Sequence, residues 1–319
     1  MKYINGTEIL SSEIVLGCDG MGTVLDEKAS FELLDEYIAL GGNHLDTARV
    51  YGYPASESEK LLGRWLKARG NREKIVVTTK GAHPEPQTMH ISRLSEKDIG
   101  GDVENSLKDL QTDYIDLYLL HRDDEKIPAG EIIETLNKYI KEGKIREIGA
   151  SNWKAKRIEE ANAYAEKHGL RGFAASQIKW SYGTVSDGFC EDPTLVPMDK
   201  EEYGRYLKNG ITVFAYASQC KGFFSKYDKG GEEALSPKAK ERYLCGENLE
   251  RYAVAKEIAE ANGCGIGAVI LQYILNQPFT AFPIVGCKNI AQLRDSFETV
   301  KCNVSNEEIL KLVEMGNRF

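Results

Sequence analysis

Short apolar runs alternate with segments of helical periodicity along almost the whole chain. A polar or glycine-bearing loop follows each run, and apolar residues then recur at the spacings of an amphipathic helix, so the pattern predicts successive strand–helix units. Strands are expected near residues 14–17, 42–46, 75–80, 114–121, 145–151, 173–177, 211–216 and 279–286. Eight such units favour a closed (β/α)8 TIM barrel built as one domain over residues 1–319.

Three local signals add detail to this barrel. Asn5-Gly6 lies between short apolar stretches near the N-terminus and is typical of a β-hairpin turn. Asp26 and Ser95 each precede a helical pattern and are predicted to cap those helices. The longest connection follows the seventh strand, over residues 217–248, and is expected to be an irregular lid or binding loop.

A glycine-rich stretch after the first strand competes with the barrel interpretation. The segment Gly17-Cys18-Asp19-Gly20-Met21-Gly22 precedes a helix, and Asp46 lies about where a dinucleotide-binding fold has its acidic residue. The glycine spacing is not that of the GxGxxG fingerprint, and eight strand–helix units fit a barrel better than a doubly wound sheet. These glycines are therefore expected to let a ligand approach the first loop closely.

Polar residues close several predicted strands, and in a parallel barrel those strand ends meet at one mouth. Asp46, Lys80 and His121 each close a different strand, and Tyr51 follows Asp46 by five residues. A phenol is a poor acid at neutral pH unless a cation stabilises its phenolate, and a lysine held by a carboxylate can do so. Each residue alone fits a helix cap or a strand end, but together they predict a catalytic set for proton transfer to a carbonyl oxygen.

The next strand ends suit a flat ligand with hydrogen-bonding edges. Ser151, Asn152 and Gln177 could bond a planar carboxamide, although helix capping explains Ser151 and Asn152 equally simply. Tyr216 closes the seventh strand and could stack on a heteroaromatic ring or pack against its neighbours. After the eighth strand, Gly286 and Lys288 precede a helix and can offer backbone N–H groups and a positive charge to a phosphate.

Composition narrows the classes of partner. The net charge is -8 with no run of like charges, which gives no electrostatic support for a nucleic-acid surface. No apolar run reaches membrane-spanning length and the N-terminus lacks a signal-peptide pattern, so no membrane association and a cytoplasmic location are expected. The seven cysteines show no CxxC pair and are expected to be reduced, and neither the cysteines nor the histidines have the spacing of a metal site.

With these motifs the chain resembles the aldo-keto reductase superfamily over essentially its whole length. The matching stretches are 16–22, 44–52, Lys80, 116–121 and 145–152. The resemblance implies an oxidoreductase that uses NADP(H), less often NAD(H), to interconvert a carbonyl (aldehyde, ketone or sugar) and its alcohol. It implies that Tyr51 is the acid/base, that Asp46 and Lys80 tune it, and that His121 orients the carbonyl.

The resemblance also implies a set of binding residues. The substrate would contact Tyr51 and His121. By residue type alone, Trp153, Trp180 and Tyr182 are candidate walls of the substrate pocket, although ordinary core or rim packing explains each at least as well. The cofactor would contact Met21, Ser151, Asn152, Gln177, Tyr216, Ala217, Ser218, Cys220, Gly222, Gly286, Lys288, Gln292 and Ser296.

Departures from the family pattern leave the choice between NADP(H) and NAD(H) open. Many relatives have Ser-Pro-Leu where this chain has the segment Ala217-Ser218-Gln219-Cys220. Ser296 stands where an adenine-contacting Asn is common, and Gln292 stands where some relatives have an Arg for the 2′-phosphate. Lys288 and Arg294 are candidates for the missing charge.

The resemblance admits a second class of function, a cofactor-binding regulatory subunit similar to the potassium-channel β subunits. The substrate, the direction of reaction, and a monomeric or homo-oligomeric state are left open by the sequence.

Overall fold

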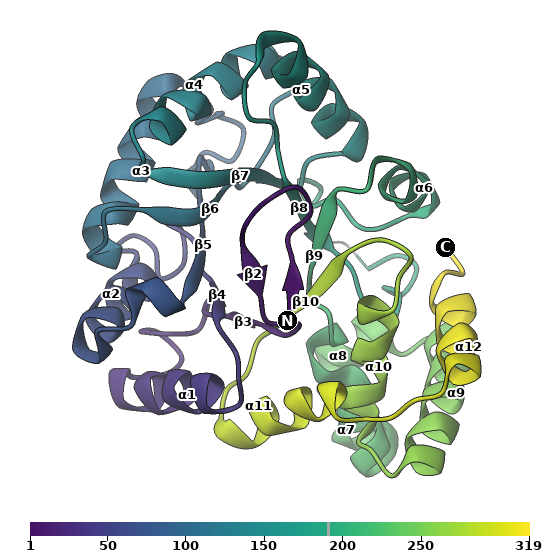
Figure 1. Cartoon of the computed structure of the whole chain (residues 1–319). Coiled ribbons are helices and arrows are strands. Elements are labelled where there is room, and N and C mark those ends of the chain that lie inside the picture. Colours follow the sequence, from purple (N-terminus) through teal and green to yellow (C-terminus); the bar gives the residue numbers. More distant parts are fainter. Residues whose placement is uncertain (190–191) are drawn as a thin grey trace.

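Eight parallel strands close into a barrel in the computed structural model, which describes residues 1–189 and 192–319. Neighbouring strands follow the chain order and the last strand pairs with the first, so the predicted (β/α)8 TIM barrel and its eight strands are confirmed (Figure 1). The strands are β3 (Val15–Gly17), β4 (His44–Asp46), β5 (Val76–Gly81), β6 (Ile115–Leu120), β7 (Ile145–Ser151), β8 (Ala175–Lys179), β9 (Thr212–Tyr216) and β10 (Ala281–Val285).

The predicted N-terminal hairpin is confirmed and covers one end of the barrel (Figure 1). Strands β1 (Lys2–Tyr3) and β2 (Leu10–Ser11) pair antiparallel, and Gly6 in their turn has a φ of 73°. Asn5 bonds the side chain of Thr212 at the start of β9, and Thr280 just before β10 donates to Asn5. The hairpin therefore seals the N-terminal ends of the strands and leaves the C-terminal ends for the chemistry.

Helices surround the barrel, and the first and the third begin at the capping residues predicted for them. Asp26 accepts a hydrogen bond from the N–H of Ala29, and Ser95 accepts one from Asp98, so both predicted caps are confirmed. The helices are α1 (Glu27–Ala39), α2 (Glu57–Arg69), α3 (Glu96–Leu110), α4 (Ala129–Lys141), α5 (Ala155–His168), α6 (Lys200–Asn209), α7 (Phe223–Gly230), α8 (Pro237–Tyr243), α9 (Gly246–Asn262), α10 (Ile266–Leu275), α11 (Ile290–Phe297) and α12 (Asn306–Gly316). Short 3-10 turns are η1 (Arg72–Lys74), η2 (Cys220–Gly222), η3 (Gly231–Ala234) and η4 (Glu298–Val300).

The hydrophobic core has two parts. Inside the barrel, Leu117 and Leu119 of β6 pack with Phe214 and Phe282, whose rings stack with centroids 5.1 Å apart. A larger cluster lies between the strands and the surrounding helices. Because this packing buries strand residues on both sides, the strand ends are held rigidly enough to position a site.

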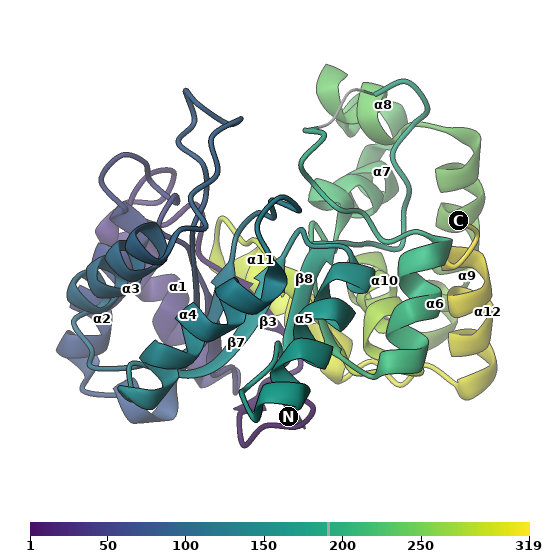
Figure 2. The ribbon, with the colours of Figure 1, turned by 90° about the horizontal axis from the view of Figure 1, so that it is seen from above.

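The connection over residues 217–248 differs from its prediction as an irregular loop. It contains α7, α8 and two 3-10 turns, and Phe223, Phe224 and Tyr243 are buried in the core. The glycines and the proline of this segment predicted irregular chain. In the structure, however, Gly230 ends α7 and Pro237 begins α8. Figure 2 shows α7 and α8 rising beside the barrel at the end opposite the N-terminal hairpin.

One pair of cysteines overturns the expectation that the thiols are reduced. Cys264 precedes α10 and Cys302 follows η4, and the two form a disulfide with their Cα atoms 6.1 Å apart. They lie 38 residues apart in sequence, so no local spacing marked them, and only the packing of α10 against η4 brings them together. Cys18, Cys220, Cys245 and Cys287 are free, while Cys190 lies outside the described residues.

Within residues 1–189 and 192–319, no helix is by itself long and apolar enough to cross a membrane, although α9 and α10, bent by 106° at their junction, are long and apolar enough as a pair.

Candidate active site

A buried lysine connects three of the four predicted catalytic residues. Lys80 in β5 is fully buried, and its Nζ donates to Asp46 Oδ2 at 2.8 Å and to the Thr47 carbonyl oxygen at 2.8 Å. The same Nζ lies 3.4 Å from the hydroxyl oxygen of Tyr51. Gln177 in β8 donates to the other Asp46 oxygen at 2.8 Å, so the carboxylate is held from two sides. The neighbouring parallel strands β4 and β5 thus place the Asp46 carboxylate and the Lys80 ammonium group beside the Tyr51 phenol.

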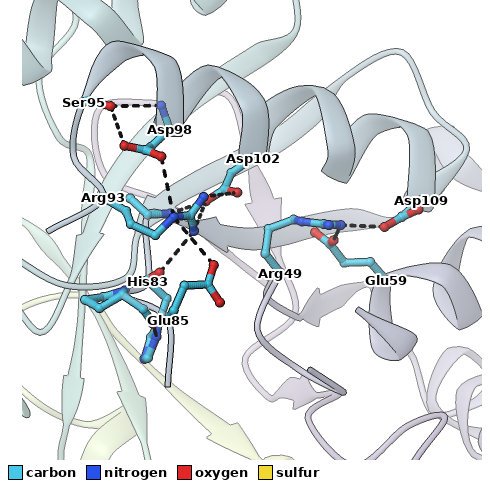
Figure 3. A network of polar contacts seen from close by, with 11 residues as sticks. Arg49, Glu59, His83, Glu85, Arg93, Ser95, Asp98, Asp102 and Asp109 are labelled. Carbon is cyan, nitrogen blue, oxygen red and sulfur yellow. Dashed lines mark hydrogen bonds and ion pairs between the residues drawn. The ribbon is translucent and has the colours of Figure 1, made fainter. Parts of the chain in front are cut away.

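The loop that carries Tyr51 is tied to the barrel and to two helices. The N–H of Arg49 bonds the Lys80 carbonyl oxygen at 2.9 Å. The Arg49 guanidinium contacts Glu59 Oε2 of α2 and Asp109 Oδ2 of α3, each at 2.6 Å (Figure 3). Glu59 is fully buried and also accepts from Thr79 of β5 at 2.6 Å. These anchors fix the chain on both sides of Tyr51, and the phenol therefore faces Lys80 with little freedom.

His121 lies just beyond β6 and faces Tyr51. The two rings meet edge to face with centroids 6.0 Å apart, and a second imidazole, His83, contacts His121 with centroids 4.7 Å apart. Burial lowers the pKa of His121 well below its ordinary value, and the nearby charges of Lys80 and Arg122 lower it further. His121 is therefore neutral at pH 7 and can donate one hydrogen bond from its ring without carrying a charge.

The protonation of Lys80 and Tyr51 reflects competing effects. Burial alone would lower the pKa of Lys80, but Asp46 and Tyr51 outweigh it and the pKa is raised, so the ammonium form is held. Burial raises the pKa of Tyr51 above its ordinary value, and Lys80 opposes that rise without cancelling it. Lys80 lowers the pKa of Tyr51, as expected from the sequence. The net change in this pKa is nevertheless upward, because removal from water disfavours the phenolate.

An arginine clamp shapes the loop that carries His83. Arg93 forms two hydrogen bonds to Asp102 of α3, at 2.9 and 3.0 Å, and donates to the His83 carbonyl oxygen at 3.1 Å (Figure 3). Asp102 also accepts from the N–H of Ala82 at 2.8 Å. A bidentate arginine–carboxylate pair that is mostly buried fixes orientation as well as distance. The clamp therefore holds the loop after Lys80 against His121.

The residues predicted to bind a carboxamide form one connected group. Asn152 has a φ of 57° just after β7, and its Oδ1 accepts from the Tyr216 hydroxyl at 2.7 Å. Its Nδ2 donates to Ser151 Oγ at 3.1 Å. Gln177 lies next to them in the sheet and bonds Asp46, as described above. The structure brings these four predicted residues and the catalytic set to the same barrel mouth.

The predicted pyrophosphate segment has an unusual backbone. Ala217, Cys220, Lys221 and Gly222 all have φ between 49° and 79°, a region that turns successive N–H groups toward a common side. Ser218 Oγ donates to the Ile284 carbonyl oxygen of β10 at 2.6 Å, which ties this segment to the neighbouring strand.

The residues after β10 are arranged around the start of α11. Asn289 caps α11, Gly286 has open space where a Cβ would lie, and Lys288 is exposed. Gln292 accepts from the Lys288 N–H at 2.8 Å. The buried Ser296 donates to the Gln292 carbonyl oxygen and accepts from Gln219, while Met21 is buried in the first loop. Arg294, the other candidate for a phosphate charge, is paired with Glu36 of α1 at 2.7 Å.

The predicted aromatic pocket walls are buried and pack against other aromatic rings. Trp153 has no exposed surface and packs edge-on against Phe173, with centroids 5.3 Å apart. Trp180 stacks on Phe279, and Tyr182 has no exposed surface. The structure therefore does not bring Trp153 together with Tyr51 and His121, because the chain after Asn152 turns outward into α5 and carries the indole into the helix–strand layer.

Several residues that shape this site carry no strong sequence signal. The Thr47 carbonyl is a backbone group, and Glu59 and Asp102 are ordinary charged residues of amphipathic helices until their burial is known. His83 had one available signal, its position three residues beyond Lys80 at a strand end. Within the part of the chain that the structure describes, no group of three histidine, cysteine or acidic side chains has the arrangement of a metal site.

Fold and site define a barrel protein of the oxidoreductase class. The chain matches the Aldo/keto reductase family over residues 13–317 and belongs to that family. It is 30% identical to norsolorinic acid reductase of Emericella nidulans over 92% of this chain and 73% of that protein. It is 29% identical to the uncharacterized oxidoreductase YrpG of Bacillus subtilis (98% and 94% covered) and 29% identical to the NADP(+) aryl-alcohol dehydrogenase of Phanerodontia chrysosporium (91% and 76% covered).

Proposed function

We propose that the protein interconverts a small carbonyl compound and its alcohol with NAD(P)(H), using Tyr51 as the general acid and base. The contacts of Lys80 carry this proposal, since one buried ammonium group bonds Asp46, the Thr47 carbonyl and the Tyr51 hydroxyl together. A cation at 3.4 Å stabilises the phenolate that remains after Tyr51 has given its proton to the carbonyl oxygen. The same phenolate accepts the proton in alcohol oxidation.

Each neighbouring side chain has a defined task in this reaction. Asp46 and Gln177 keep Lys80 in place and charged. His121, neutral at pH 7, donates a hydrogen bond that orients the carbonyl oxygen toward Tyr51. The anchoring of Arg49 to Glu59 and Asp109 limits movement of the Tyr51 loop, so proton transfer needs little reorganisation.

The residues around the mouth fit a nicotinamide dinucleotide. When bound, the reduced nicotinamide supplies the hydride that adds to the carbonyl carbon. Ser151, Asn152 and Gln177 would hold the carboxamide and Tyr216 would stack on the ring. The segment from Ala217 to Gly222 and the start of α11 would bind the phosphates, in keeping with the positive-φ backbone and with the open space at Gly286.

We propose NADP(H) as the preferred cofactor. Lys288 is exposed beside the start of α11 and has no ion pair within residues 1–189 and 192–319, so its charge is available to a 2′-phosphate. NADP(+) also appears in the name of one relative. A higher affinity for NADH than for NADPH in the purified protein would contradict this choice.

The Tyr51→Phe variant tests the proposed chemistry. Removing the hydroxyl should lower the rate of hydride transfer by roughly a thousandfold or more, the upper part of the range for general acid catalysis, while cofactor affinity changes little. Single-turnover oxidation of NADPH with a panel of aldehydes, ketones and sugars measures that rate. An unchanged rate in Tyr51→Phe would refute the role of Tyr51, and tight cofactor binding with no turnover by the unmodified protein would favour a regulatory subunit.

A further inference from the structure

The backbone of His121 is held firmly, but its buried ring nitrogen Nδ1 is not. The His121 N–H donates to the Gly81 carbonyl oxygen at 2.9 Å, and the His121 carbonyl oxygen accepts from Arg122 at 2.8 Å. Nδ1 of the ring has no hydrogen-bond partner among the residues that the structure describes. A catalytic imidazole is commonly oriented by a hydrogen bond to its second ring nitrogen. Another contact must therefore orient this ring.

Two aromatic rings contact the His121 imidazole, both edge to face. The Tyr51 ring has its centroid 6.0 Å away with the planes at 80°, and the His83 ring lies closer, at 4.7 Å and 75°. This geometry is one that aromatic pairs prefer, and their attraction weakens with distance. Tyr51 also has to exchange a proton with the substrate. His83 is therefore the nearer ring and the one whose contact serves orientation alone.

The His83 ring is itself fixed in place. Its Nδ1 lies 2.6 Å from the Pro84 carbonyl oxygen, and because a carbonyl oxygen only accepts, this nitrogen carries the proton. The carbonyl oxygen of His83 accepts from Arg93, whose guanidinium is paired with Asp102 of α3 (Figure 3). Burial lowers the pKa of His83 below its ordinary value, so the ring is neutral at pH 7. His83 thus presents an uncharged ring in a defined orientation.

The backbone just before His83 adopts a conformation that a strand end does not require. Ala82 has a φ of 58°, in the left-handed region that residues with a Cβ rarely adopt. Its N–H donates to Asp102 at 2.8 Å, and this bond holds the disfavoured conformation in place. The contact between His83 and His121 is what this turn achieves. Backbone strain of this kind gathers at functional sites.

We propose that His83 is a positioning residue whose ring holds the His121 imidazole in the plane from which it donates a hydrogen bond to the substrate carbonyl. The ring contact takes the place of the hydrogen bond that Nδ1 of His121 lacks. His83 needs neither a contact with the substrate nor a proton in this role, so the chemistry of Tyr51 is unchanged. The inference rests on the proposed function, because the orientation of His121 matters to the reaction only if that ring meets a carbonyl.

His83→Ala tests this role, with His83→Phe as the conservative variant and His90→Ala as the matched control at an exposed histidine of the same connection. NADPH oxidation is measured with the carbonyl compound that the unmodified protein reduces fastest. Loss of the ring contact in His83→Ala should lower kcat by about two- to tenfold, while KM and the Kd for NADPH stay within about twofold. His83→Phe keeps a ring and should retain at least about half of kcat. His90→Ala should match the unmodified protein.

The outcomes separate this inference from the proposed function. An unchanged kcat in His83→Ala would overturn the inference and leave the proposed function standing. An equal loss in His83→Ala and His83→Phe would also overturn it, since the effect would then belong to the imidazole nitrogens and not to ring packing. No turnover by the unmodified protein, or unchanged hydride transfer in Tyr51→Phe, would overturn the proposed function and the inference with it.

NMR of the histidine side chains reads the orientation of His121 without a substrate. In protein made with isotopically labelled histidine, the His121 ring signals are assigned by their loss in His121→Asn. We expect a single narrow set of these signals in the unmodified protein and in His83→Phe. In His83→Ala they should broaden or shift, because the ring then samples several orientations. Identical His121 signals in the unmodified protein and in His83→Ala would contradict positioning by His83.

Arg93→Met tests the route by which the arginine clamp acts. Without the guanidinium the His83 carbonyl oxygen is released, so kcat should fall by about two- to tenfold. The double variant with His83→Ala should be no slower than the slower single variant, because both changes remove one interaction. Losses that multiply in the double variant would refute a route from Arg93 through His83. His83 is only partly buried, so His83→Ala keeps the inference testable if Arg93→Met does not fold.

Discussion

Replacing Lys80 by methionine removes the cation beside Tyr51 while keeping a side chain of similar length. Two unit charges 3.4 Å apart interact by about 5 kcal/mol at an effective dielectric constant of about 20. At about 1.4 kcal/mol for each tenfold change, this sets an upper limit of roughly three-thousandfold on the loss of rate. Tyr51 is partly exposed, which screens the interaction, so we expect kcat to fall by about 10²- to 10³-fold.

The direction of the pH profile makes this prediction specific. Alcohol oxidation needs the Tyr51 phenolate, and burial already raises the pKa of Tyr51 above its ordinary value. Without Lys80 nothing opposes that rise, so the pKa increases again and the oxidation rate should reach its plateau at a higher pH than in the unmodified protein. Stopped-flow measurement of NADP+ reduction between pH 6 and about 11 records both the rate and the midpoint.

Stability must be separated from chemistry in this experiment, because Lys80→Met leaves the buried Asp46 carboxylate without its ion-pair partner. Such an unpaired charge costs about 3–5 kcal/mol of folding free energy. The double variant Asp46→Asn/Lys80→Met removes both charges and should regain much of that stability without regaining activity. Lys67→Met, on the exposed side of α2, serves as the surface control. A folded Lys80→Met protein with an unchanged rate and pH midpoint would refute the reasoning.

Three further predictions address the anchors and the cofactor. Glu59→Ala leaves Arg49 and Thr79 without their buried partner, so the free energy of unfolding in urea should fall by about 3–5 kcal/mol; a loss below about 1 kcal/mol would mean that solvent replaces this contact. Tyr216→Phe keeps a ring for stacking whereas Tyr216→Ala does not, so fluorescence titration should give a clearly weaker Kd for NADPH only in the alanine variant; equal weakening in both would instead assign the effect to the lost hydroxyl bond with Asn152. Lys288→Met should weaken NADPH binding by about tenfold and NADH binding by less than about twofold, and equal effects on the two cofactors would exclude a 2′-phosphate contact.

The barrel was predictable because its determinants are local and repeated. Eight apolar runs, each followed by a helical pattern, define the strand–helix order, and that order permits few closed arrangements. The helix starts at Asp26 and Ser95 were predictable for the same reason, since a cap depends on only a few neighbouring residues. The connection over residues 217–248 was wrongly predicted as an irregular loop because its local helix preferences are weak. Burial of Phe223, Phe224 and Tyr243 stabilises helices there instead.

The sequence by itself determined which residue types lie at the strand ends, and so brought Asp46, Lys80 and Tyr51 to one mouth. Only the tertiary structure decided how they interact: the bond to the Thr47 carbonyl, the burial that raises the pKa of Tyr51, and the retreat of Trp153 into the core. It also decided that Cys264 meets Cys302 and that a cavity lined by Arg122 reaches Asn152. The reason is physical, since hydrogen bonds, desolvation and cavities depend on distances between segments far apart in sequence, which no local pattern encodes.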